Sequence, residues 1–345
     1  MLLKLSLFLA LASPVPALRT RRPGHRADES GVSLQDTRRG CGSVSLPPWS
    51  KIAKYVISAQ VYRMHNSSNS TAIVTYAGLQ KQSYIDGAVL LARSLVHLNL
   101  STELWCLVHK SMANSTKRIL QHAGWNIREV ESWLPEHWIK RDCGYWHDAY
   151  NKVDIFRLPF KKVLYLDADT LVMGSSNDLN EILEPELQPG EIKMVKDCNG
   201  KNFNSGVMVF QPTLDAFRRV HEIMAEGQLD QPAINVAYAG NITRLPNKYN
   251  VHGYGKHNCN DTVIAHYTGQ HKPAEASLTN MRRVSNGAYA HISQYALNCP
   301  DLYERYFAEL EAEVDYLSPK LQELLTLPSV MRWMAGGMPK TTELQ

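Results

Sequence analysis

Segments typical of β-strands and of α-helices alternate along residues 72–166, and this alternation limits the fold more than any other feature of the sequence. Short runs rich in β-branched residues are followed by stretches whose apolar residues recur three or four positions apart. A strand–helix–strand order favours parallel pairing, because the helix returns the chain to the same end of the sheet. We therefore predict an α/β fold with a mostly parallel central sheet flanked by helices. The expected strands are residues 72–76, 103–108, 127–130 and 162–166, and the expected helices are residues 85–98, 116–123 and 149–156.

The second half of the chain continues this pattern less regularly. In open α/β sheets, ligands bind beyond the carboxyl ends of the strands. The strand ends at which we expect a site are therefore those after Tyr76, Leu166, Phe210 and Tyr267. The further strands that we expect are residues 192–195, 206–210 and 262–267, and the further helices are residues 214–225, 231–239 and 301–325.

The N-terminal region differs from the rest of the chain. Residues 1–17 combine a positive start, a short apolar run and a small-residue cleavage site, which is typical of a signal peptide. The apolar run is shorter than the roughly 20 residues that span a bilayer, so we expect no stable transmembrane segment. Residues 18–70 are expected to be a basic stem or linker, residues 71–290 the main folded domain, and residues 291–345 a helical C-terminal extension.

The positive charge is concentrated in this same N-terminal region. The formal net charge is +4, and residues 1–40 account for all of it, with seven Lys or Arg against three Asp or Glu. Residues 41–345 are therefore balanced in charge. A nucleic-acid partner is not expected, because such proteins carry a basic patch or stripe.

Several features are typical of a protein of the secretory pathway. The six cysteines are widely spaced and include no Cys-X-X-Cys pair, so a zinc site is not indicated. In an oxidising compartment some of them would form disulfides, whereas Cys106, in an apolar strand, is also compatible with a buried free thiol. We expect a location in the lumen of the ER or Golgi, or secretion. The six Asn-X-Ser/Thr sites, each a potential glycan site, are at Asn66, Asn69, Asn99, Asn114, Asn241 and Asn260.

The sequence Asp167-Ala168-Asp169 directly follows an apolar strand and is the sharpest chemical signal. Side chains two positions apart in an extended chain lie on the same side, so the two carboxylates would be neighbours. Adjacent carboxylates repel each other unless a cation lies between them, and Mg²⁺ or Mn²⁺ suits oxygen ligands. The alternative is a structural turn in which Asp169 caps a following helix. The position at a strand end favours the metal site.

A second signal, residues 266–273, also follows an expected strand. His266 could add a nitrogen ligand to a carboxylate-bound metal. Gly269 would let the backbone approach a phosphate closely, and Lys272 could place a positive charge on a diphosphate. For His266 by itself, an ordinary core histidine remains the alternative.

Five motifs, in order along residues 72–273, together resemble the glycogenin-like glycosyltransferases of family eight, which are retaining enzymes with the fold called GT-A. The resemblance implies that residues 71–290 form a GT-A domain with a UDP-sugar site. The motifs are DADTLV at 167–172, FNSGVMVFQP at 203–212, LDQ at 229–231, LP-x-x-YN at 245–250, and H-x-x-G-x-x-KP at 266–273.

The resemblance also implies a role for individual residues. The metal ligands would be Asp167, Asp169 and His266, holding Mn²⁺ or Mg²⁺. Asp230 and Gln231 would lie near the anomeric carbon of the donor sugar, and Lys272 would stabilise the departing diphosphate. The residues implied for binding the donor are Thr75, Tyr76, Tyr84, Lys152, Asp167, Asn204, Ser205, Gly269 and Lys272.

The activity implied by the resemblance is the metal-dependent transfer of a hexose from a UDP-sugar to a glycan or glycoprotein acceptor. UDP-glucose is the favoured donor, with UDP-GlcNAc, UDP-galactose and UDP-glucuronate as alternatives. Retention could arise by attack on the same face or through a covalent adduct on Asp230, and both routes stay open. A catalytically silent sugar-binding protein is the alternative of another class. The expected partners are the donor and acceptor, without nucleic acid, and with a homodimer as an option.

Overall fold

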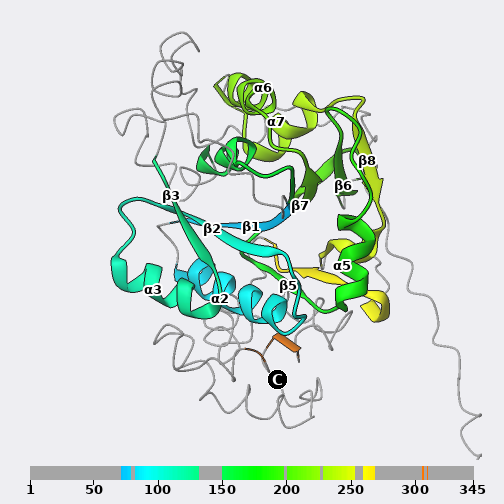
Figure 1. Cartoon of the computed structure of the whole chain (residues 1–345). Helices are drawn as coiled ribbons and strands as arrows, with labels where there is room; N and C mark the ends of the chain where they lie inside the picture. The colour runs from blue at the N-terminus through cyan, green and yellow to red at the C-terminus, as the bar shows by residue number, and fades with distance from the viewer. Residues whose placement is uncertain are drawn as a thin grey trace, which may run out of the picture. The chain divides into compact units, whose positions relative to one another are not determined.

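The computed structural model describes residues 71–78, 82–131, 150–197, 200–225, 228–252, 259–268, 305–306 and 309. A seven-stranded sheet runs through these residues in the order β3-β2-β1-β4-β7-β6-β8 (Figure 1). Its strands are β1 (Thr71–Ala77), β2 (Glu103–His109), β3 (Asn126–Val130), β4 (Lys162–Leu166), β6 (Ile192–Lys196), β7 (Phe203–Phe210) and β8 (Ile242–Leu245).

The expected α/β fold with a mostly parallel sheet is confirmed. Strand β7 alone runs against its neighbours in this sheet, pairing antiparallel with both β4 and β6, while the other adjacent strands are parallel. The helices are α2 (Gln82–Val96), α3 (Asn114–Ala123), α5 (Ser176–Leu183), α6 (Leu214–Ala225) and α7 (Asp230–Ala237), with the short 3-10 helices η4 (Lys152–Arg157), η5 (Asn247–Tyr249) and η6 (Cys259–Asp261).

Each face of the sheet has its own hydrophobic core. Alternation along β4 shows this directly, because Leu164 and Leu166 join the core on the α2 side whereas Val163 and Tyr165 join the core on the α6 side. All five residues of β4 are buried. Figure 1 shows α2 and α3 on one face and α6 and α7 on the other. This double cover explains why the residues of β4 after Lys162 do not alternate between apolar and polar.

The antiparallel direction of β7 corrects one expectation about the site. We expected a ligand beyond the carboxyl end of residues 206–210, but Phe210 lies opposite Val163, at the start of β4. It is the other end of β7, at Asn204 and Ser205, that reaches the edge where β4 ends. The sequence could not indicate this direction, because a short run of apolar residues looks the same whether its strand is parallel or antiparallel to the neighbouring strands.

A second, smaller sheet was not expected from the sequence. It consists of β5 (Thr170–Val172), β10 (Ile264–His266) and β9 (Val251–His252), in the order β5-β10-β9. Residues 262–267 were predicted as a strand, and β10 lies within that range, but it pairs with β5 outside the central sheet. Strands of two or three residues are too short to give a periodic signal.

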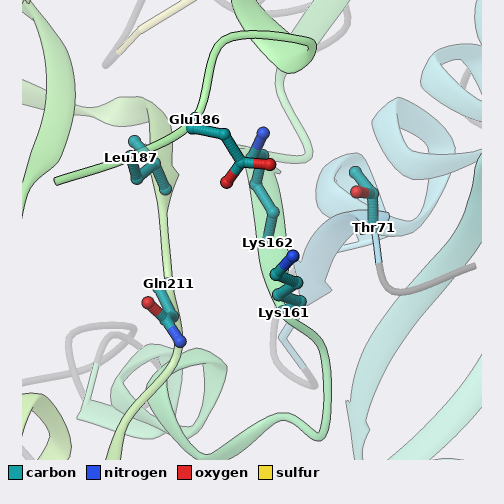
Figure 2. A pocket seen from close by; sticks show the side chains of 6 residues that line it. All are labelled: Thr71, Lys161, Lys162, Glu186, Leu187 and Gln211. Atoms are coloured by element: carbon teal, nitrogen blue, oxygen red, sulfur yellow. The ribbon is translucent and has the colours of Figure 1, made fainter. Parts of the chain in front are cut away.

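A hollow in the surface lies at the sheet edge opposite to the end of β4 (Figure 2). It is lined by the first residues of β1 and β4 together with Lys161, Glu186, Leu187 and Gln211. Lys162 has a structural role there, because its Nζ donates hydrogen bonds to the carbonyls of Leu183 at 2.7 Å and Pro185 at 3.0 Å. It thus satisfies carbonyls at the C-terminal end of α5.

The predicted signal peptide, stem and most of the C-terminal extension lie outside the described residues. Of residues 291–345 the structure describes 305, 306 and 309, where Tyr306 is buried and packs edge-on against Tyr267 with ring centroids 5.0 Å apart. None of the helices in the described part of the chain is long and apolar enough to cross a membrane.

Candidate metal centre and donor site

The turn that carries Asp167 and Asp169 begins where β4 ends and is held by backbone hydrogen bonds. The N–H of Asp167 donates to the carbonyl of Gly206 at 2.8 Å, which continues the pairing with β7. The N–H and Oγ1 of Thr170 both donate to the Asp167 carbonyl, at 3.0 and 2.7 Å. Strand β5 then pairs with β10, which brings His266 opposite Thr170. The small sheet therefore places His266, which is distant in the sequence, beside the turn.

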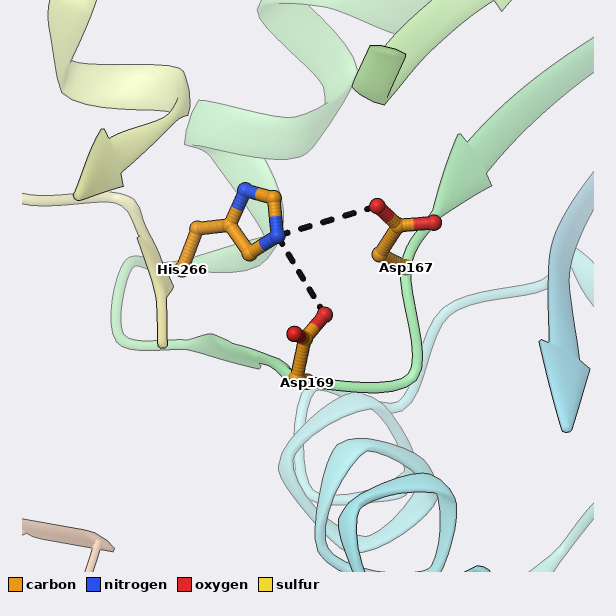
Figure 3. A group of neighbouring side chains, drawn as sticks. All are labelled: Asp167, Asp169 and His266. Atoms are coloured by element: carbon orange, nitrogen blue, oxygen red, sulfur yellow. Dashed lines mark ion pairs between the residues drawn. The ribbon is translucent and has the colours of Figure 1, made fainter. Parts of the chain in front are cut away.

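The side chains of Asp167, Asp169 and His266 converge on one point (Figure 3). The Nε2 atom of His266 lies 3.2 Å from Oδ1 of Asp169 and 3.7 Å from Oδ2 of Asp167. One ligand atom from each residue lies within 4.8 Å of the other two. Two carboxylates and an imidazole nitrogen make a donor set that fits Mn²⁺ or Mg²⁺. The three residues that we predicted as metal ligands are thus brought together.

Two glycines allow this close packing. A Cβ atom on Gly87, in α2, would lie 2.2 Å from the carbonyl oxygen of Ala168, and one on Gly206 would lie 2.1 Å from Cε1 of His266. Any larger residue would have to displace the turn or the imidazole ring. The turn that carries Asp167 and Asp169 is therefore packed directly against helix α2, and His266 directly against strand β7.

Lys152 joins the candidate metal cluster to a second group of polar side chains. Its Nζ lies 3.0 Å from Oδ1 of Asp167 and 3.0 Å from Oδ2 of Asp230, and donates to the carbonyl of Ser205 at 2.9 Å. Burial alone would lower the pKa of Lys152, but the carboxylates of Asp167 and Asp230 outweigh it and raise the pKa above its usual value. The lysine is therefore held as a cation between the two carboxylates.

Tyr165, two residues before Asp167 on the same side of β4, completes this environment. Its hydroxyl donates to Oδ1 of Asp167 at 2.7 Å, and Nζ of Lys152 lies 4.7 Å from the centre of its ring. Burial, followed by the charge of Asp167, raises the pKa of Tyr165 well above its usual value. The tyrosine therefore stays neutral and donates its hydroxyl hydrogen to Oδ1 of Asp167. The other carboxylate oxygen, Oδ2, faces His266.

Ser205 connects Lys152 with the start of helix α7. Its hydroxyl donates to Oδ2 of Asp230 at 3.0 Å, and its backbone N–H donates to Oε1 of Gln231 at 3.1 Å. The other end of the Gln231 amide, Nε2, donates to Oδ2 of Asp197 at 3.0 Å. Asp230 and Gln231 are thereby fixed at the same sheet edge as the carboxylate pair.

The remaining predicted donor residues divide into two groups. Thr75 and Tyr76 lie near the carboxyl end of β1. The pairing of Val74 with Tyr165 in β4, continued along the two strands, brings Tyr76 level with Asp167. The Thr75 hydroxyl is buried and has no hydrogen-bond partner among the described residues, and Tyr84 is partly buried in the first turn of α2. Gly269 and Lys272 lie outside the described residues, so their roles stay predictions.

Sequence reasoning missed three side chains that contact the site. Tyr165 lies in the same strand motif as Asp167, and a period of two would have placed them on the same side. Asp197 follows β6, whose carboxyl end lies at the same edge of the sheet as the site. The expectation that ligands bind beyond the carboxyl ends of strands could therefore have indicated it. Asn250 ends the LP-x-x-YN motif, and its Oδ1 lies 2.9 Å from Nδ1 of His266; nothing in its spacing indicates this contact.

Curated proteins with similar sequences include glucuronosyltransferases and glycogenins. The chain is 26% identical over 182 residues to inositol phosphorylceramide glucuronosyltransferase 1 of Arabidopsis thaliana, covering 50% of this chain and 31% of that protein. It is 30% identical over 135 residues to glycogenin-1 of Mus musculus, covering 33% and 38%. The chain thus spans about a third of the length of either relative.

Solved structures with a similar fold include galactosyltransferase LgtC in complex with donor and acceptor sugar analogs, with a TM-score of 0.46 and 19% identity, covering 60% of this chain and 91% of that one. The model of a protein family described as glycosyl transferase family 8 matches residues 76–275, which is more than half of the chain and includes Asp167, Asp169, His266 and the start of α7. The chain belongs to glycosyl transferase family 8.

Proposed function

We propose that this protein is a metal-dependent retaining transferase that moves a hexose from a UDP-sugar to a glycan or glycoprotein acceptor. The observation that carries the proposal is the convergence of Asp167, Asp169 and His266 at the sheet edge where Lys152 meets Asp230 and Gln231. A divalent cation bound there would supply charge stabilisation to the departing diphosphate. The motif resemblance, which extends through all of these residues, supports the same reading.

The protein's own residues have distinct tasks in this proposal. Lys152 keeps Asp167 and Asp230 in place and neutralises part of their charge. Ser205 holds Asp230 and Gln231 beside the position that the donor sugar would occupy, while Lys272 contributes a positive charge towards the diphosphate. Asp230 is then available either to stabilise a positively charged sugar or to act as a nucleophile.

UDP-glucose remains the favoured donor, and UDP-glucuronate is the second candidate. Five relatives named as glucuronosyltransferases, including UDP-glucuronate:xylan alpha-glucuronosyltransferase 2 of Arabidopsis thaliana, favour the second. A glucuronate carboxylate needs a cationic partner, however, and Lys152 in the described part of the site is already paired with two carboxylates. Because Lys152 already has two carboxylate partners, it supports a donor whose sugar is an uncharged hexose rather than glucuronate.

Two observations support a location in the lumen of the secretory pathway. Cys259 is disulfide-bonded, and disulfides persist in oxidising compartments. The four Asn-X-Ser/Thr asparagines in the described residues are exposed, as glycan attachment requires: Asn99, Asn114, Asn241 and Asn260.

Release of UDP from a panel of UDP-sugars tests the function. With Mn²⁺ present we expect UDP to appear fastest from UDP-glucose, and we expect EDTA to stop the release. Binding of UDP-sugars without any release would favour the sugar-binding protein instead. Release that EDTA leaves unchanged would contradict the metal dependence, and a faster reaction with UDP-glucuronate would replace the favoured donor.

A further inference from the structure

The imidazole of His266 has a second polar contact on the side that faces away from the carboxylates. Figure 3 shows one ring nitrogen directed between Asp167 and Asp169 and the other directed away from them. This other atom, Nδ1, lies 2.9 Å from Oδ1 of Asn250. Asn250 is 1% exposed and directly follows η5. The proposed function gives this buried amide no role.

A backbone N–H determines which atom of Asn250 faces the histidine. The N–H of Gly206 can only donate, and it donates to Oδ1 of Asn204 at 2.9 Å. The same oxygen accepts a hydrogen bond from Nδ2 of Asn250 at 2.9 Å. The amide nitrogen of Asn250 is therefore committed to Asn204, which leaves its oxygen facing Nδ1 of His266.

An oxygen in that place requires a hydrogen on Nδ1, because a carbonyl oxygen can only accept. When the imidazole is neutral, its lone pair then lies on Nε2, the atom that faces Asp167 and Asp169. The opposite tautomer would place two acceptors against each other at Asn250 and direct an N–H bond into the space for the metal. The chain of contacts from Gly206 through Asn204 and Asn250 thus selects the tautomer that can bind a cation.

The orientation of the ring is restricted as well. A Cβ on Gly206 would lie 2.6 Å from Nδ1 of His266, so the ring rests directly on the backbone of β7. The hydrogen bond to Asn250 prevents rotation of the ring about its attachment, and both His266 and Asn250 are buried from water that could replace this contact. Asn250 therefore controls both the tautomer and the direction of the imidazole.

We propose that Asn250 is a positioning residue that holds His266 with a hydrogen on Nδ1 and aims the lone pair of Nε2 at the metal position. The metal-binding consequence rests on the proposed function, whereas the tautomer does not. Hydrogen-bond partners of metal-binding histidines typically strengthen metal affinity about 10–100-fold.

Titration with Mn²⁺, followed by the EPR signal of the free ion, tests the consequence for binding. We expect Asn250→Ala to raise the dissociation constant about 10–100-fold, since the ring loses the contact that orients it. Asn247→Ala is the matched control, because Asn247 is an exposed residue of the adjoining η5, and it should bind Mn²⁺ like the wild type. Wild-type affinity in a folded Asn250→Ala variant would overturn the proposal.

NMR of the wild-type protein labelled with ¹⁵N-histidine provides the second test. The signals of His266 are assigned by their loss in His266→Ala, and we expect a hydrogen on Nδ1. A bare Nδ1 with the hydrogen on Nε2 would overturn the proposal. This measurement decides the question even where Asn250→Ala does not fold. Absence of Mn²⁺ binding by the wild type, by contrast, would contradict the proposed function and leave the tautomer to the NMR result.

Discussion

Lys152 shows how much of this site depends on a single buried side chain. It bridges Asp167, from the turn after β4, and Asp230, from the start of α7, although the two carboxylates are 63 residues apart in the sequence. Buried ion pairs contribute little net stability, yet leaving one member unpaired is costly. The lysine therefore specifies the relative positions of the turn after β4 and helix α7. The resemblance assigned it to donor binding, and its ion pairs add this structural role.

His221, in α6, yields a prediction about the pH dependence of stability. It is completely buried, and burial, followed by the charge of Arg157, lowers its pKa from 6.5 to about 4. A pKa lowered by folding means that the unfolded chain takes up a proton first as the pH falls. The stabilisation by neutral His221 is therefore fully present above pH 6.5 and is lost between pH 6.5 and 4, by about 3 kcal/mol.

Urea unfolding of His221→Leu and the wild type across this pH range measures the effect. We expect the stability of the wild type to fall more steeply than that of the variant between pH 6.5 and 4. The same substitution at the exposed His122 of α3 should alter the slope much less. Parallel pH profiles for the wild type and His221→Leu would show that His221 does not titrate in this way.

At the scale of secondary-structure elements, helix α2 packs tightly against the turn that carries Asp167 and Asp169. The side of α2 at Gly87 lies against the backbone of Ala168. Replacing a glycine in the middle of a helix with alanine ordinarily stabilises a protein by about 0.5–1 kcal/mol. Here the added methyl group would overlap a carbonyl oxygen that belongs to the backbone, so we expect the opposite sign.

Thermal unfolding and Mn²⁺ titration of Gly87→Ala test this contact. We expect a loss of stability of about 1–3 kcal/mol, as for other overpacked sites, together with weaker Mn²⁺ binding because the turn between Asp167 and Asp169 must move. A variant as stable as the wild type, or more stable, would mean that the helix and the turn are not in contact.

The elements themselves were largely predictable. Strand β4 matches the expected range, and α3 ends before Gly124, whose positive φ of 122° explains why a glycine follows the helix. The small sheet β5-β10-β9 and the direction of β7 were not predictable, because they depend on pairings between distant segments rather than on local periodicity. For the same reason, the motifs indicated His266 as a ligand but not the contact from Asn250 that orients it.

At the scale of the whole molecule, the exposed asparagines predict covalent modification. We expect protein from its native host to carry N-glycans at one or more of the four described sites, Asn99, Asn114, Asn241 and Asn260. Peptide mapping after enzymatic deglycosylation would detect them as Asn-to-Asp conversions. Asn247 is exposed without the Asn-X-Ser/Thr pattern and serves as an internal control. Unmodified asparagine at all four sites would contradict the proposed luminal location.

The central claim is that Asp167, Asp169 and His266 bind a divalent cation together with a uridine nucleotide. Thermal unfolding of the wild type, Asp169→Asn and Asp215→Asn tests it, with and without Mn²⁺ and UDP. Asp215 is the matched control, because its side chain is 82% exposed on α6. Without ligands we expect Asp169→Asn to melt close to the wild type, since the substitution removes repulsion from Asp167 along with the contact to His266.

With the Mn²⁺–UDP complex, treated as one ligand, at 100 times its dissociation constant, we expect the wild type and Asp215→Asn to gain about 2.7 kcal/mol of stability. Asp169→Asn should gain almost nothing, because a neutral amide cannot balance the cation as a carboxylate does. An equal gain in Asp169→Asn and the wild type would contradict the account, since Asp167 and Asp169 would then form a structural turn rather than a metal site.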